Sequence, residues 1–168
     1  NPEISRQIRI KTGHPIYEGF GQTETTVVCG TFSEFMEIRP GSMGRPSPLY
    51  YVQRLNNEGK PVEQGETGEI CIRLRDKQDD PALTETVMHD GYYHLGDLAY
   101  CDSDGYYWFV GRKDDIIKSS GYRIGPFEVE SALMEHPAVL ECAITGVPDT
   151  EGVRGQLGKA TIILAPGY

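Results

Sequence analysis

The chain has 168 residues, of which 38% are hydrophobic, so it is long enough to bury one core or parts of two domains. Its formal net charge of −9 argues against nucleic acid or an anionic membrane as the main partner. No run approaches the ~18 consecutive apolar residues of a membrane-spanning helix, and no basic segment with an apolar core marks a signal peptide at the N-terminus.

The four cysteines stand far apart and form no C-x-x-C pair. This spacing favours neither a disulfide framework nor a zinc site, and it favours a reducing compartment over a secreted one. The chain starts without Met and stops just after an apolar run, so we expect a fragment of a larger protein.

In the first half, residues 2–12 carry Ile4 and Ile8 at helical spacing and end at Gly13, which predicts a short helix. A strand is predicted around residues 15–20. Residues 49–55 and 69–75 alternate with period two and predict strands, with turns between them.

Further along, residues 98–111 predict two strands joined by a turn at Ser103 to Gly105. The middle of the chain is therefore predicted to form a small, mostly antiparallel sheet or barrel.

In the last third of the chain, a predicted helix joins the strands. A short hairpin is predicted to turn at residues 119–121, and a helix follows over 125–137, with Pro126 at its first position. Its inward stripe is predicted to hold Val129, Ala132, Leu133 and His136. Strands at 139–147 and 159–166 complete a small α+β unit that begins near residue 114.

Residues 19–26, GFGQTETT, gather glycines, hydroxyls and one carboxylate. Backbone N–H groups of a glycine-rich turn can converge on an anion, and a threonine hydroxyl can add a hydrogen bond. A carboxylate would repel phosphate unless it holds a divalent metal, so Glu24 beside Thr23 suggests a magnesium–nucleotide site. The alternative is a polar turn whose glycines merely permit the backbone geometry.

Five motifs occur in a characteristic order: GFGQTET from Gly19, GETGEICIR from Gly65, LGDL from Leu95, GRKDD from Gly111 and GYRIG from Gly121. From about Ile16 to Pro166 the chain closely resembles the AMP-forming acyl-CoA synthetase and adenylation superfamily, which includes firefly-type luciferases. Residues 119–149 look most like the medium-chain acyl-CoA synthetase group.

The resemblance implies an α/β fold class, present here as an α+β fragment. Residues 1–113 would be the end of the large AMP-binding domain, with a mostly antiparallel, β-barrel-like subdomain at about 45–113. Residues 114–168 would begin the small C-terminal domain.

The resemblance also implies a two-step ligase reaction. A carboxylic acid, here a medium-chain fatty acid, attacks the α-phosphate of ATP to give an acyl-adenylate, and the thiol of coenzyme A then displaces AMP. ATP or AMP, Mg²⁺ and coenzyme A are the implied cofactors. The implied location is the cytoplasm or the mitochondrial matrix.

The resemblance assigns seven residues to the nucleotide: Phe20, Gly21, Gln22, Thr23, Glu24, Asp97 and Arg112. Thr23 would contact phosphate and Glu24 would associate with magnesium. Phe20 stands where the family usually has a tyrosine against the adenine. His94 replaces a family arginine, and we assign it no role.

Asp97 would accept both ribose hydroxyls, because two carboxylate oxygens match a vicinal diol. Arg112 would reach the ribose and phosphate. Without the resemblance, Asp97 could equally be a turn residue, and Arg112 could form a surface ion pair with Asp114 or Asp115.

Asp114 matches the family's hinge between the two domains. Coenzyme A is assigned to the loop residues Ser120, Gly121, Tyr122 and Arg123, although Gly121 could instead be only a hairpin turn. Residues 65–73 are interpreted as scaffold.

The family's phosphate loop, expected upstream, has no counterpart in these residues. The late catalytic lysine has none either, since Lys159 begins a strand and does not lie in the expected late loop. We therefore expect no acyl-adenylate formation by these 168 residues alone, and we name no catalytic residue. The alternative functions are another branch of the superfamily, either a peptide synthetase or a luciferase-like enzyme, and a non-catalytic nucleotide-binding module.

Overall fold

The computed structural model describes residues 2–33, 36–73 and 88–168. Within these ranges the elements are, in chain order, α1 (Pro2–Thr12), β1 (Gly19–Gln22), β2 (Thr26–Gly30), β3 (Ser42–Pro46), β4 (Val52–Leu55), β5 (Gly68–Arg73), β6 (Met88–His89), β7 (Tyr92–Cys101), β8 (Tyr107–Arg112), β9 (Ile117–Ser119), β10 (Tyr122–Ile124), α2 (Pro126–Leu133), β11 (Val139–Pro148) and β12 (Gln156–Leu164). None of the helices in these ranges has the length and apolar character needed to cross a membrane.

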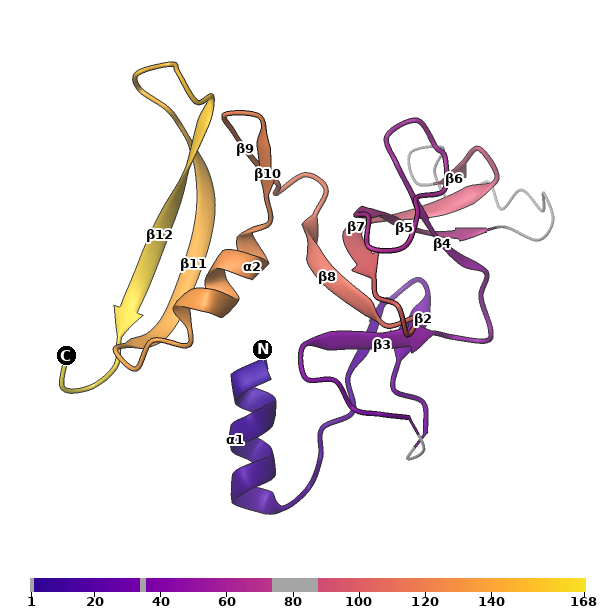
Figure 1. Cartoon of the computed structure of the whole chain (residues 1–168), viewed down its shortest axis with the longest axis horizontal. Coiled ribbons are helices and arrows are strands. Elements are labelled where there is room, and N and C mark those ends of the chain that lie inside the picture. Colours follow the sequence, from indigo (N-terminus) through magenta and orange to yellow (C-terminus); the bar gives the residue numbers. More distant parts are fainter. Residues whose placement is uncertain (1, 34–35, 74–87) are drawn as a thin grey trace.

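Most strands belong to one antiparallel sheet with the order β1-β2-β3-β8-β7-β5-β4, and β6 pairs with β7. This confirms the mostly antiparallel arrangement expected for the middle of the chain. The sheet also takes in β1 to β3, so it begins upstream of residue 45. Figure 1 shows this sheet set apart from a smaller unit of β11, β12 and α2, with β9 and β10 along the chain between them.

The core of the sheet lies where β5 and β7 pack against β2. Gly68 to Ile72 of β5 are all buried, so the period-two pattern of this strand does not separate a buried face from an exposed one. The reason is that both faces are covered by other residues: Ile70 and Ile72 lie in the hydrophobic core cluster, and Glu69 and Cys71 contact His94. Glu69 is consequently only 5% exposed and Cys71 is fully buried.

The predicted strand around residues 15–20 starts later than expected. β1 begins at Gly19 because its backbone partner, β2, ends opposite it at Gly30. The two predicted hairpins are confirmed: β7 and β8 are joined around Ser103 to Gly105, and β9 and β10 are joined at Ser120 and Gly121.

The helix predicted over 125–137 is shorter, because α2 ends at Leu133, four residues before Pro137. Val129 and Leu133 are partly buried, but Ala132 and His136 are exposed, so the predicted stripe is wrong at two positions. α2 packs on β11 and on β8, which lie along only part of its surface.

Candidate active site

The turn between β1 and β2 is held by its own residues. Thr25 N–H donates to Gln22 O (3.1 Å), and Gln22 N–H donates to the Thr25 hydroxyl oxygen (3.0 Å). A β-carbon at Gly21 would lie 1.6 Å from Thr26 O, so glycine is required there by the close approach of two backbones. The close approach of the two backbones is therefore enough to explain why residue 21 is a glycine.

Thr23 and Glu24 are exposed at the tip of this turn. Among the residues that the structure describes, neither side chain makes a hydrogen bond or an ion pair. Glu24 lies close enough to Tyr93 for its charge to act there: burial and then the Glu24 carboxylate raise the pKa of the Tyr93 phenol. A hydroxyl and a carboxylate are thus presented together with no hydrogen-bond or ion-pair partner among the described residues.

Asp97 on β7 gathers two other predicted residues around its carboxylate. The Gln22 side-chain amide donates to Asp97 Oδ2 (3.0 Å) and to Leu95 O (2.7 Å). Arg112 Nη1 lies 3.3 Å from Asp97 Oδ1 and donates to Leu95 O (2.9 Å). Three residues from three different strands therefore meet at one carboxylate.

Burial dominates the electrostatics of Asp97, whose residue is only 5% exposed. Loss of solvation raises its pKa, and Arg112 and Gln22 lower it by less, so the net shift is upward. A buried carboxylate with a raised pKa and unused lone pairs is suited to accept hydrogen bonds from a ligand.

A β-bulge determines which side of the sheet each of two neighbouring cations occupies. Asp97 pairs with Arg112 and Leu98 with Gly111, but Ala99 pairs with Phe109, so Val110 is the extra residue. Paired residues share a face of the sheet, and successive residues alternate between faces. Arg112 therefore shares the face of Asp97, and the next residue, Lys113, points to the opposite face.

On that opposite face lies a second charged cluster. Lys113 Nζ is 2.7 Å from Glu69 Oε2, and His94 Nδ1 is 3.1 Å from the same oxygen. The Cys71 sulfur lies 3.4 Å from His94 Nδ1. Burial tends to raise the pKa of Glu69, but the hydrogen bonds from Lys113 and His94 outweigh it, so the net shift is downward.

This cluster is consistent with a structural role for residues 65–73. The sequence interpretation missed Glu69 as a charged residue in the core. Its position in an apolar strand, directly after a glycine, was the available signal.

Next to Asp97 is a cleft of about 330 Å³ whose walls include Phe20, Phe109 and Phe127. The Phe20 and Phe109 ring centroids are 6.3 Å apart, and Phe109 and Phe127 meet edge to face at 5.4 Å. The cleft thus combines flat apolar walls with one buried carboxylate, a combination that suits an aromatic base joined to a sugar.

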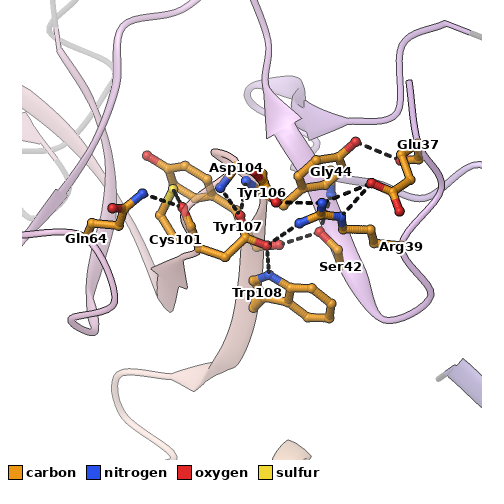
Figure 2. A network of polar contacts seen from close by, with 11 residues as sticks. Glu37, Arg39, Ser42, Gly44, Gln64, Cys101, Asp104, Tyr106, Tyr107 and Trp108 are labelled. Carbon is orange, nitrogen blue, oxygen red and sulfur yellow. Dashed lines mark hydrogen bonds and ion pairs between the residues drawn. The ribbon is translucent and has the colours of Figure 1, made fainter. Parts of the chain in front are cut away.

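A third wall of the cleft, Gly41 to Met43, is fixed by a polar network that Figure 2 shows around Arg39. Arg39 forms ion pairs with Asp102 (2.9 Å) and Asp104 (2.7 Å) in the turn between β7 and β8. Its guanidinium also lies over the Tyr106 ring, 4.3 Å from the centroid. The segment that leads to β3 is therefore attached to the β7–β8 hairpin.

Ser42, which lines the cleft, adds a further contact to the network around Arg39. The Ser42 hydroxyl donates to Tyr107 O (3.0 Å) and accepts from Gly44 N–H (3.0 Å). This places the cleft-lining part of β3 directly on β8.

The remaining predicted residues lie elsewhere. Asp114 is exposed and 3.3 Å from Arg112 Nε. Ser120, Gly121 and Tyr122 form the exposed β9–β10 turn, which Figure 1 shows well away from β2 and β3. Arg123 lines a separate cavity of about 270 Å³ together with Glu69 and Leu98, and so on the face opposite Asp97.

Comparison with known families matches two parts of the chain. Residues 1–75 match the family described as AMP-binding enzyme, and residues 128–168 match the AMP-binding enzyme C-terminal domain. Together these ranges cover about two thirds of the chain.

A curated protein with a similar sequence is named as an acyl-coenzyme A synthetase. The acyl-coenzyme A synthetase ACSM3, mitochondrial, of Mus musculus is 48% identical over 100% of this chain and 30% of its own length. The chain thus spans about 30% of the length of this curated relative.

Two solved structures are similar to this fold. The anthranilate CoA ligase AuaEII in complex with anthranoyl-AMP has a TM-score of 0.85 and 35% identity, covering 99% of this chain and 33% of that one. ATP-bound MatB from Rhodopseudomonas palustris has a TM-score of 0.87 and 27% identity, covering 99% and 34%.

Proposed function

Because the chain belongs to the AMP-binding enzyme family, we propose that the protein carrying it is an AMP-forming acyl-CoA synthetase. In such an enzyme a carboxylate attacks the α-phosphate of ATP to give an acyl-adenylate and release pyrophosphate, and the thiol of coenzyme A then takes the acyl group and releases AMP.

The observation that carries this proposal is the meeting of Gln22, Asp97 and Arg112 beside an aromatic cleft. Asp97 accepts the two ribose hydroxyls, one on each oxygen, while Gln22 and Arg112 hold the carboxylate in place. Phe20 packs against the adenine, without the hydroxyl that a tyrosine would add. Arg112, which is 42% exposed at its side chain, keeps donors available for phosphate.

The turn between β1 and β2 suits the phosphate end of the nucleotide. Glu24 and Thr23 offer hard oxygen atoms that no described residue engages, and Mg²⁺ prefers such ligands while it keeps several waters. The metal, when bound, neutralises phosphate charge. Glu24 holds it through the carboxylate, and Thr23 donates its hydroxyl hydrogen bond to a phosphate oxygen.

We further propose that the chain divides near Asp114 into two domains, residues 1–113 and 114–168, with Asp114 as the hinge. The exposure of Asp114 and its place directly after the last strand of the large sheet support this assignment. Coenzyme A would contact Ser120 to Arg123, as the resemblance implies, and the exposure of these four residues supports this assignment.

For the substrate we propose a medium-chain fatty acid, on the resemblance of residues 119–149; the relative named acyl-coenzyme A synthetase ACSM3, mitochondrial, 48% identical, supports an acyl substrate. That name also favours the mitochondrial matrix over the cytoplasm for this protein. The anthranilate ligase among the similar structures is named for an aromatic acid, so an acid panel must include one.

The test is to assay the protein that carries this chain with ATP, Mg²⁺, coenzyme A and carboxylic acids of about four to about ten carbons, with anthranilate as the aromatic comparison. Acid-dependent pyrophosphate exchange followed by coenzyme A-dependent release of AMP and thioester is the expected result. Nucleotide binding without either product for any acid would instead favour a non-catalytic nucleotide-binding module.

A further inference from the structure

Tyr50 contacts the β1–β2 turn from a distant part of the chain. Its hydroxyl donates a hydrogen bond to the carbonyl oxygen of Thr25 (2.6 Å), 25 residues earlier. The Tyr50 ring is partly buried and packs against the core of the sheet. Tyr50 was not singled out from the sequence, and its only polar side-chain contact in the described ranges is with this turn.

The backbone at Tyr50 is itself anchored to β2. Tyr50 N–H donates to Ser47 O (3.2 Å), and Ser47 N–H donates to Val28 O (2.7 Å). Ser47 is buried, with only 3% of its surface exposed. The hydroxyl of Tyr50 therefore approaches Thr25 from a fixed platform.

The bond acts on the most strained peptide of the turn. Thr26 has a φ of 57°, in the left-handed region that β-branched residues disfavour. The Thr25 carbonyl belongs to the same peptide plane as Thr26 N, so a hydrogen bond to that carbonyl restrains the plane that sets this φ. Thr25 is buried and also bonds Gln22, so Tyr50 completes the set of contacts around it.

We propose that Tyr50 is a positioning residue for the metal and phosphate end of the nucleotide site. The proposal rests on the function proposed above. Thr23 and Glu24 have no internal partner in the described ranges, so their positions depend on the backbone of the turn alone. Tyr50 fixes that backbone and thereby holds the hydroxyl and the carboxylate where MgATP needs them.

The experiment compares Tyr50→Phe with the unmodified protein that carries this chain, by titration with MgATP and, separately, with adenosine. Loss of one hydrogen bond is expected to weaken MgATP binding about 3- to 10-fold. Adenosine affinity should not change, because the aromatic cleft and Asp97 hold the nucleoside. A general loss of structure would weaken both ligands together or lower the active fraction without changing either affinity.

Tyr106→Phe is the matched control. The Tyr106 hydroxyl also donates to a backbone carbonyl, Glu37 O (2.8 Å), which lies in the segment before β3 and not in the β1–β2 turn. This control should leave the affinity ratio of MgATP to adenosine unchanged. An unchanged ratio in Tyr50→Phe, or an equal shift in both variants, would overturn the proposal for Tyr50 alone.

The two proposals fail differently. If the unmodified protein bound neither MgATP nor adenosine, the proposed function would be refuted and the role of Tyr50 with it. If the unmodified protein bound both ligands and Tyr50→Phe behaved identically, only the positioning role would be lost.

Discussion

Replacing Asp97 with asparagine tests the central contact of the proposed nucleotide site with almost no change in shape. In the structure, Asp97 Oδ1 faces Arg112 and Oδ2 faces the Gln22 amide. Each oxygen has a second lone pair for a ribose hydroxyl. Asparagine keeps one acceptor oxygen and turns an N–H₂ group toward one of the two existing donors.

The expected loss of AMP affinity follows from the number of hydrogen bonds that asparagine cannot accept. One charge-assisted hydrogen bond to the ribose is lost, which costs about 1.5–3 kcal/mol, or about a 10- to 150-fold increase in the Kd for AMP. Glu58→Gln is the control, since Glu58 is an exposed carboxylate whose ion pair is with Lys60, outside the cleft. Titration calorimetry with AMP measures both variants.

The stability of Asp97→Asn should separate binding from folding. Burial raises the pKa of Asp97 in the folded protein, so keeping this carboxylate ionised at neutral pH costs folding free energy. The variant should therefore melt no lower than the unmodified protein at pH 7. The free energy of unfolding of the unmodified protein increases relative to that of the variant as the pH falls through the raised pKa toward 3.8. The reason is that Asp97 binds a proton more readily in the folded state than in the unfolded state. An unchanged AMP affinity in a folded Asp97→Asn variant would refute the assignment.

Three further outcomes are expected. Gly21→Ala should destabilise the fold by about 3 kcal/mol in urea unfolding, because its β-carbon meets Thr26 O; Gly19→Ala, with only ordinary contacts, should not. Glu69→Gln should cost about 1–3 kcal/mol at pH 7. Its pKa is lowered in the fold, so the advantage of the unmodified protein disappears in thermal melts as the pH falls below 4.5. Glu24→Gln should raise the Mg²⁺ concentration needed for half-maximal pyrophosphate exchange, unlike the exposed control Glu58→Gln.

Local signals in the sequence predicted much of the fold. The turn at Ser103 to Gly105 and the start of α2 at Pro126 are set by residues adjacent in the chain, and both were found. The burial of β5 on both faces was not found, since it depends on residues that the fold brings together from other strands. Ala132 was misplaced for the same reason, because β11 and β8 cover only part of α2.

The residues of the candidate site also divide into those that the sequence identified and those that only the fold brings together. The resemblance to a family selected Gln22, Asp97 and Arg112, and the structure brings these three together. Tyr50 was missed because its role depends on β3 pairing with β2, which places residue 50 beside residue 25. No spacing along the chain encodes that contact.

The bulge at Val110 makes the register of β8 matter more than its composition. If Val110 paired with Leu98 in a regular ladder, the register would set Arg112 opposite Gly96 and move its charge to the face of Glu69. Lys113 would then take the side of Asp97, and a flexible ammonium would replace a planar two-pronged donor beside the ribose. Many substitutions in β8 can leave this sorting of charges intact. Loss of the bulge in a β8 of unchanged length would exchange the two cations while leaving every side chain involved in place in the sequence.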